Sequence, residues 1–259
     1  MTDSIDKIYK FLVENTKQRG SISLILSSNT TDWVTSFNPI IELNNIEDYE
    51  IGLIDLETYY SFPNVTLDNN KFKYFNGATN KTITIPVGSY EITALNAAIQ
   101  LGMQTNGDWD SANNAYYINI YPNISTLKSV IEITNPSYTV DFTINNSLRE
   151  LLGFSLVILT NGVNNSQNII NILTINSILV NCSIVGSSYI NGNLNPIIYS
   201  FFPNVGPGYK IIERPQRIVY LPITTRNIMQ IRLWLTDQNG KTLDLRGETI
   251  TSRLEIKKK

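Results

Sequence analysis

The side chains that could carry chemistry are carboxylates, because the 259-residue chain contains no histidine and a single cysteine, Cys182. Without histidine there can be no Ser-His-Asp triad, no Cys-His dyad and no His-ligated zinc. One cysteine allows neither an internal disulfide nor a cysteine-ligated metal cluster. Cys182 lies in the apolar run 178–184, so we expect a buried small hydrophobe rather than a reactive thiol. We therefore expect no enzyme, no catalytic residue, no cofactor and no metal.

The segment 237–248 is the best match to a calcium-binding loop. Asp237, Asn239 and Glu248 occupy positions 1, 3 and 12 of an EF-hand pattern. However, a lysine stands at position 5, where a ligand oxygen is needed, and a threonine at position 6, where the sharp turn requires glycine. We interpret the segment as a β-hairpin whose Asn-Gly pair at 239–240 forms a type I′ turn.

Two other acidic segments could hold a cation or act as a pair of acid–base groups. The loop 108–114 gathers short oxygen-bearing side chains, but their spacing fits no defined metal site. Several carboxylates follow one another over 42–57, and a glycosidase needs two of them about 5 to 10 Å apart. Glu50 and Asp55 are separated by an odd number of residues, which predicts opposite faces of one strand. No catalytic pair stands out.

Composition narrows the class of protein further. The 20 lysines and arginines against 22 aspartates and glutamates give a net charge of −2, which argues against an electrostatic nucleic-acid binder. The longest apolar stretch, 151–159, is far shorter than the roughly 20 residues that span a bilayer. The first residues lack the basic and apolar regions of a secretory signal. We expect a soluble protein made inside a cell without a signal peptide.

The elements that position these side chains are mostly strands. Helical spacing of Ile5, Ile8, Phe11 and Leu12 predicts an amphipathic N-terminal arm over 1–19, ending at a glycine. Beyond it the pattern alternates with period two, and turn residues separate the runs. The predicted strands are 21–26, 49–56, 81–86, 116–121, 129–134, 138–144, 169–175, 178–185, 197–202, 217–222, 228–235 and 249–256.

Two short helices interrupt the strands. The spacing of apolar residues predicts one over 93–101, and a capping box at Ser147–Glu150 followed by Gly153 predicts another. Many short strands, few helices and regularly spaced turns are typical of a β-sandwich. Because no linker, repeat or shift in composition marks a boundary, the sequence indicates an arm over 1–19 and one all-β domain over 20–259.

Several short motifs occur in the order found in a known family. They are densest toward the C-terminus, and together they extend from about residue 45 to residue 256. The matching segments are 49–64, 69–72, 85–92, 141–143, 151–154, 180–182, 188–191, 208–213, 220–222, 237–240 and 245–248. In these segments the chain resembles the penton, or minor capsid, single jelly-roll proteins of Polinton/Maverick-type viruses, adintoviruses and virophages.

This resemblance implies a jelly-roll β-sandwich of about eight core strands, with extra strands and long loops. It implies a homopentamer at the fivefold vertices of an icosahedral capsid, beside a double jelly-roll major capsid protein and in some cases a vertex spike. The implied location is the virion. The length agrees, since one β-sandwich takes about 100–250 residues and a double jelly roll about twice that.

For such a subunit the residues of interest are interface residues. The candidates are the arm residues Ile5, Ile8, Phe11 and Leu12, the adjacent pair Tyr59 and Tyr60, and Arg246 with Glu248. The two tyrosines place one ring on each face of a strand. The arginine and glutamate, two residues apart, are expected on one strand face, where they could pair with a neighbouring strand or subunit.

Three alternatives stay open at the level of sequence. A β-sandwich carbohydrate- or receptor-binding module could use Trp109 or Tyr59 and Tyr60 to stack on a sugar, with acidic loops holding calcium. A carboxylate-dependent hydrolase would need a pair that the sequence does not single out. A domesticated host copy of a viral gene would have the same fold.

Overall fold

We analysed a computed structural model, which describes residues 20–172 and 175–259. The predicted arm, with Ile5, Ile8, Phe11 and Leu12, lies outside the described residues. Contacts within the chain form two compact units. The sandwich unit comprises the described residues 20–61 and 175–259, and the inserted unit comprises the described residues 62–172 between them.

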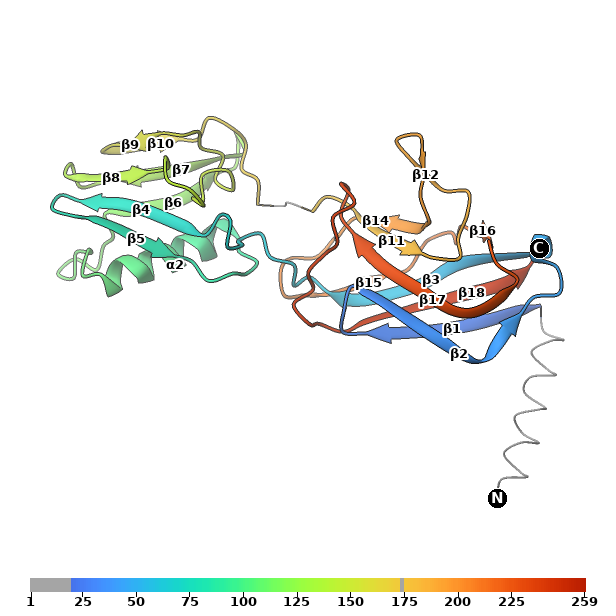
Figure 1. Ribbon diagram of the computed structural model, residues 1–259. Coiled ribbons are helices and arrows are strands. Elements are labelled where there is room, and N and C mark those ends of the chain that lie inside the picture. The colour runs from blue at the N-terminus through green and yellow to red at the C-terminus, as the bar shows by residue number, and fades with distance from the viewer. Residues whose placement is uncertain (1–19, 173–174) are drawn as a thin grey trace, which may run out of the picture. The chain divides into compact units, whose positions relative to one another are not determined.

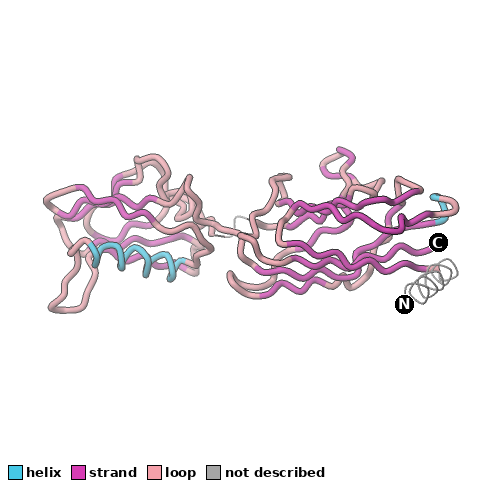
Figure 2. Tube along the Cα trace, turned by 60° about the horizontal axis from the view of Figure 1, so that its bottom comes forward, coloured by secondary structure: helices cyan, strands magenta, loops and turns pink. Residues whose placement is uncertain are grey.

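The sandwich unit is built from two antiparallel sheets (Figure 1). The first sheet has the order β1 (Ser21–Ser28), β18 (Ile250–Lys258), β3 (Tyr49–Tyr59) and β15 (Lys210–Glu213), and the short β16 (Leu221–Pro222) also pairs with β3. The second sheet has the order β14 (Ile197–Phe201), β11 (Ile178–Cys182), β17 (Asn227–Thr236) and β2 (Asp32–Glu42). Figure 2 shows the strands of this unit stacked in two layers.

The route of the chain between these sheets defines a jelly roll. In chain order the eight long strands are β1, β2, β3, β11, β14, β15, β17 and β18. Strands β1, β3, β15 and β18 belong to the first sheet, and β2, β11, β14 and β17 belong to the second, so the chain passes repeatedly between the sheets. Two four-stranded sheets connected in this order form an eight-stranded jelly roll, which contains two Greek keys. The predicted single jelly roll is therefore confirmed, and the inserted unit interrupts it between β3 and β11.

Alternating side chains build the core of the sandwich unit. In β18 the inward residues include Leu254 and Ile256, and in β17 they include Ile231, Leu233 and Leu235, all of them buried. The alternation has period two because successive side chains of a strand point to opposite faces. Each such aliphatic side chain contributes about 1.5–3 kcal/mol by leaving water, which favours this alternation. In β17 the alternation holds from Ile231 onward, after a shift of register between Ile228 and Gln230.

A β-bulge in β3 changes which of its residues face inward. Along β18 the partner of Arg253 is Asp55 and the partner of Leu254 is Leu53, so Ile54 is an extra residue. Before the bulge the core residues are at the odd positions Ile51 and Leu53, and after it they are at the even positions Leu56 and Thr58. The bulge therefore reverses the parity on which the prediction for Glu50 and Asp55 rests.

That prediction is wrong, because both carboxylates lie on the outer face of the first sheet. Glu50 pairs with Lys257 at 3.3 Å and Asp55 with Arg253 at 3.6 Å. The two cations are four residues apart on the regular strand β18 and so share one face. A bulge is a tertiary feature that a count of residues does not reveal.

The inserted unit has its own core. Its strands are β4 (Lys71–Asn76), β5 (Asn80–Thr84), β6 (Ile118–Asn123), β7 (Lys128–Ile133), β8 (Tyr138–Asp141), β9 (Ile158–Leu159) and β10 (Gly162–Asn165). They form sheets of order β5-β4-β8-β9 and β10-β7-β6. Helix α2 (Ile92–Thr105) contacts β6 and buries Leu95, Ile99 and Met103 in a core that also holds Phe72 and Phe142. Figure 2 shows this helix alongside the strands.

The sequence indicates one domain over 20–259, whereas the described residues form two compact units. The chain crosses between the units near 61–62 and 174–175, where no glycine- or serine-rich linker occurs. Both units are also rich in alternating β-branched and aromatic residues. The amino-acid composition therefore does not change at either crossing. The two cores are distinguished only by which distant strands pair with one another.

Some elements differ from the predicted ones. Strand β2 was not predicted, because Asp32 and Pro39 interrupt its alternation and most of its side chains are exposed or half-buried. An edge strand tolerates proline, since one side of its backbone has no partner strand. Strands β4 and β15 and the short elements η1 (Ile46–Asp48), β12 (Tyr189–Ile190) and β13 (Asn193–Leu194) were not predicted either. The predicted strand 169–175 is irregular at the residues that the structure describes.

The predicted second helix is only a turn. Ser147 Oγ donates to the Phe142 carbonyl instead of closing the capping box, and Glu150 pairs with Arg149. The turn closes through the Leu152 N–H on the Leu148 carbonyl, and Gly153 follows with φ of +75°. The glycine is thus a stop signal as predicted, but a single turn precedes it.

Burial predicts that Cys182 does not react in the folded protein. The side chain is fully buried in β11, and burial raises the pKa of its thiol to about 12. Since the thiolate is the nucleophile, almost none is present at pH 8. We expect no reaction with an aromatic disulfide reagent at pH 8 and one equivalent of reaction in denaturant, measured by absorbance. Rapid reaction of the native protein would contradict this burial.

Candidate functional site

The predicted tyrosine pair is divided between core and surface. Tyr60 is only 6% exposed, whereas Tyr59 at the end of β3 is 38% exposed. The backbone N–H of Tyr60 donates to the Tyr209 carbonyl at 2.9 Å, which ties the end of β3 to the segment before β15. Only Tyr59 is therefore available to a partner.

Arg246 and Glu248 do not lie on one strand face. They belong to a turn in which the Glu248 N–H donates to the Leu245 carbonyl at 3.0 Å. Arg246 and Gly247 both have positive φ, +55° and +80°, which defines a type I′ turn. The carboxylate of Asp244 accepts from the Arg246 N–H at 2.8 Å and stabilises it. Both residues are exposed on this turn, so the prediction that they share a strand face is wrong.

The predicted type I′ turn at Asn239-Gly240 has a different geometry. Only Gly240 has positive φ, +80°, and its N–H donates to the Asp237 carbonyl at 3.0 Å. Asp237 Oδ1 accepts from the backbone N–H groups of Asn239 and Lys241 at 2.8 and 2.9 Å. This is a three-residue hairpin loop with glycine in the left-handed position. The Asp237 carboxylate organises that loop, and Glu248 lies on the separate turn described above.

Charged pairs cover the outer face of the first sheet. Besides the two pairs of Glu50 and Asp55, Lys210 Nζ lies 2.6 Å from Glu57 Oε2. Tyr220 donates its hydroxyl to Glu255 at 2.6 Å, and the Lys257 ammonium lies 3.6 Å from the centre of the Tyr220 ring. These carboxylates and cations neutralise one another, so this face is a set of cross-strand pairs rather than an acidic site.

Gly52 allows a loop to cross this outer face. A Cβ at this position would lie 2.6 Å from Ile218 Cγ2 and about 3.0 Å from the ring of Tyr220. The segment that joins β15 to β16 therefore packs directly on the backbone of β3. The motif residues Gly52 and Tyr220 thus share a structural role, which is close approach of a loop to a sheet.

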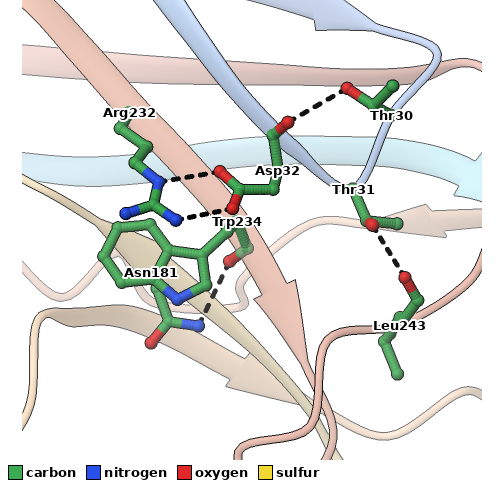
Figure 3. A network of polar contacts seen from close by, with 7 residues as sticks. All are labelled: Thr30, Thr31, Asp32, Asn181, Arg232, Trp234 and Leu243. Carbon is green, nitrogen blue, oxygen red and sulfur yellow. Dashed lines mark hydrogen bonds and ion pairs between the residues drawn. The ribbon is translucent and has the colours of Figure 1, made fainter.

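The outer face of the second sheet carries a compact polar network (Figure 3). Arg232 donates through Nε and a terminal nitrogen to both oxygens of Asp32, at 2.7 and 2.6 Å. Its guanidinium lies 4.8 Å from the centre of the Trp234 ring. Asn181 donates to the Trp234 carbonyl at 3.1 Å. The network joins β2, β17 and β11 and fixes their register at one end.

The Asp32–Arg232 pair predicts a small pH dependence of stability. The hydrogen bonds from Arg232 hold the pKa of Asp32 below its ordinary value. The stabilisation is present above the unfolded pKa, about 3.9, and is lost as pH falls through the folded value. Because the pair is partly exposed, Asp32→Asn should cost no more than about 1 kcal/mol at pH 7. Urea unfolding of both proteins at pH 7 and pH 2.5 measures it, and a cost that persists undiminished at pH 2.5 would contradict it.

In the inserted unit Asp108 is a buried carboxylate with structural partners. It accepts from the Tyr74 hydroxyl at 2.7 Å and from Asn76 Nδ2 at 2.8 Å, and Asn106 Nδ2 donates to the same hydroxyl. Burial, reinforced by the Asp108 charge, raises the pKa of Tyr138 to about 12. Both oxygens of Asp108 are therefore engaged in holding the end of α2 against β4.

The neighbouring loop 108–114 is likewise satisfied internally. Asp110 accepts from the backbone N–H of Ala112 and from both nitrogens of Asn113. The Trp109 ring stacks on Tyr116 with their centres 5.9 Å apart, so one face of each ring is already covered. Among the residues that the structure describes, no group of three or more Cys, Asp or Glu side chains could hold a metal ion.

The described residues line cavities that are open to solvent, one in each unit among them. One, of about 650 Å³ in the inserted unit, is lined by residues near the Gly153 turn, including Arg149 and Leu156. The other, of about 570 Å³ in the sandwich unit, lies between β14 and β15 and includes Arg214 and Arg217. The second was not predicted, because its lining comes from strands of two different sheets that lie together only in the folded sandwich. None of the helices in the described parts of the chain is long and apolar enough to cross a membrane.

Comparisons with known proteins find similarity to solved structures but not to family models or curated sequences. No family model and no curated protein matches this sequence. Among solved structures, the chain is similar to the SeMet-labelled mavirus penton protein, with a TM-score of 0.47 and 12% sequence identity. The match covers 93% of this chain and 99% of that chain.

Proposed function

We propose that this protein is a structural, non-enzymatic subunit of an icosahedral viral capsid, of the penton type, that forms homopentamers at the fivefold vertices. The observation that carries the proposal is where the ordered motifs fall. The motif segments 49–64, 180–182, 208–213 and 220–222 coincide with β3, β11, β15 and β16 of the jelly roll. Sequence resemblance and strand topology thus support the same architecture independently.

The shape of a jelly roll suits this role. A subunit that meets its neighbours through two different surfaces forms a closed ring, and five copies close at a vertex. Jelly rolls of this kind occur in capsids, lectins and cupins. Because the sequence has no histidine, the metal site typical of the cupin class has no imidazole ligands. The partners of the proposed ring are the double jelly-roll major capsid protein and a vertex spike, and its location is the virion.

Electron microscopy of the purified protein tests the proposal. Averages of negatively stained particles are expected to show rings with fivefold symmetry. Rings of another order, or single particles at every concentration, would count against a vertex pentamer. Isothermal titration with calcium and a glycan panel addresses the alternative, a carbohydrate- or receptor-binding module. Saturable heat that is lost in Trp109→Ala would favour that module.

We expect the N-terminal arm to act in assembly rather than in folding. The basis is the change from helical to β periodicity at Gly20, together with the absence of family motifs before it. Deletion of 1–19 should leave the thermal unfolding transition of the remaining chain intact and weaken assembly. Calorimetry and light scattering measure the two effects, and loss of the cooperative transition would contradict the prediction.

A further inference from the structure

We propose that neighbouring copies meet by inserting the turn at 244–248 of one copy into the arginine-lined cavity between β14 and β15 of the next. This contact rests on the proposed function, since it supplies the two different surfaces that a ring requires. The cavity and the turn are the two complementary halves of one interface between copies of this chain.

The cavity holds two arginines that form no close ion pair within the described residues, although Arg214 lies near enough to Glu57 for its charge to act on that carboxylate. Arg214 and Arg217 line it together with Asn204 and Gln216. Within the described residues six other lysines and arginines form ion pairs, namely Lys73, Arg149, Lys210, Arg232, Arg253 and Lys257. Arg214 and Arg217 are exposed and form none there. Glu213, at the cavity wall, is held by the Tyr199 hydroxyl at 2.8 Å. The wall thus presents two positive groups and one negative group.

The turn presents the opposite pattern. Asp244, Arg246 and Glu248 are all exposed, and the type I′ geometry projects them from the surface. None of the three forms an ion pair within the described part of the chain. Their order is negative, positive, negative. Two carboxylates can therefore pair with Arg214 and Arg217, and Arg246 can pair with Glu213, so that all six charges find opposite partners.

The cavity lies at the β15 edge of the first sheet, and the turn lies on the other side of β3, at nearly the same level. Glu57 in β3 pairs with Ile212 on one side and with Thr251 on the other, and Thr251 pairs with Ser27. This row of four strands spans about 14 Å. Ile212 lines the cavity, and Thr251 follows the turn by three residues. One copy can therefore offer its turn to one neighbour and its cavity to the other.

Further contacts place the turn over the end of β18, between β1 and β3. Thr31, which joins β1 to β2, donates its hydroxyl to the Leu243 carbonyl at 2.7 Å, and Ile250 pairs with Ser28 of β1. Figure 3 shows the first of these hydrogen bonds. The Leu245 carbonyl also accepts from the Ser61 hydroxyl at 2.7 Å, so the turn is anchored both to the β1–β2 connection and to the end of β3.

Both edges also expose apolar side chains. Phe202 beside the cavity is 72% exposed, and Ile212 on β15 is about half exposed. On the opposite edge Ile25 of β1 is 64% exposed, and Val34 of β2 is also exposed. Strand β1 carries no charge and no proline over its eight residues, so nothing in its sequence guards this edge against pairing. Apolar contact flanked by charged pairs is the usual composition of a subunit interface.

Charge exchange tests the contact in the full-length chain, by sedimentation velocity at low and moderate salt. The cavity variant is Arg214→Glu with Arg217→Glu. The turn variant is Asp244→Asn with Glu248→Lys, in which asparagine keeps the acceptor for the Arg246 N–H. Each variant should weaken association at each contact by about 100-fold, because like charges then face one another. The variant that combines all four changes should regain assembly.

Matched controls carry the same charge changes elsewhere. Lys258→Glu with Lys259→Glu matches the cavity variant, and Asp68→Asn with Glu47→Lys matches the turn variant; all four residues are exposed. Both controls should assemble as the wild-type chain does. Circular dichroism establishes that each variant is folded, and Arg214→Gln with Arg217→Gln replaces the cavity variant if it is not, with an expected weakening of about 10-fold.

The outcomes separate this contact from the proposed function. A pentamer that persists in folded cavity and turn variants overturns the contact and leaves the vertex proposal standing. An oligomer of another size that is lost in both variants and regained in their combination supports the contact and overturns the pentamer. Failure of the combined variant to recover, while both controls assemble, overturns the complementarity. A wild-type chain that stays monomeric at every salt concentration overturns the contact as well.

Discussion

Gly153→Ala is expected to destabilise the inserted unit by about 3–5 kcal/mol. Gly153 has φ of +75°, where an L side chain is strained by roughly 1–2 kcal/mol. In addition, its Cβ would lie 2.4 Å from the Asn168 carbonyl oxygen and 2.9 Å from that of Ile169. Because backbone atoms cannot rotate away as a side chain can, the segment must shift. The hydrogen bond from the Asn168 N–H to the Gly153 carbonyl would then be strained.

Gly107→Ala is the matched control for this prediction. Gly107 lies in the same unit with nearly the same φ, +76°, but no atom lies within 4 Å of its Cβ position. It should therefore show the backbone strain alone, about 1–2 kcal/mol. Hydrogen exchange resolved to peptides of residues 62–172 measures both costs. Equal loss of protection in the two variants would show that the close approach at Gly153 is wrong.

Leu254→Ala is expected to destabilise the sandwich unit by about 2–5 kcal/mol. Leu254 is fully buried in β18, between β1 and β3, beside the bulge at Ile54. Removing its side chain leaves a cavity that two well-paired neighbouring strands cannot collapse to fill. Urea unfolding with hydrogen exchange in residues 20–61 and 175–259 measures the loss.

Met229→Ala is the control for the core substitution. Met229 lies on β17 in the same unit, and its side chain is 64% exposed. Its truncation should change the free energy of unfolding by less than about 0.5 kcal/mol. A similar cost at Met229 and Leu254 would contradict the assignment of the inward face of β18.

Local pattern was sufficient to predict most strands and the main helix. Strands such as β18 alternate strictly, and α2 buries Leu95 and Ile99 at helical spacing, so one face of each element is apolar in the sequence itself. The order of motifs also indicated a jelly roll, which the strand order of the two sheets confirms. In these elements the hydrophobic period and the fold agree.

The features that the sequence did not reveal depend on distant partners. The bulge at Ile54 is defined by its register against β18, and it places Glu50 and Asp55 on one face. Strand β2 has a weak alternation and is held by its pairing with β17. The division into two units arises from which strands pair, since no linker marks it. These are tertiary effects that override local propensity.

The sequence indicated only part of the candidate interface, because the rest depends on residues that are distant along the chain. Arg246 and Glu248 stood out as charges near the C-terminus, but Arg-Gly in a type I′ turn is less frequent than Asn-Gly, so a strand was predicted. Arg214 and Arg217 become part of a cavity only when β14 and β15 lie together. Both groups consist of charged side chains that form no close ion pair in the described parts of the chain, and only the topology brings them to the surface of one sheet.

We propose that this jelly roll assembles into a ring of five. Native mass spectrometry of the purified full-length protein, at several concentrations and salt conditions, tests it most directly. We expect a principal species at five times 29.2 kDa, which dissociates as salt rises because charged pairs contribute to the contact. A dimer or trimer as the principal species, or a monomer under all of these conditions, would contradict the account.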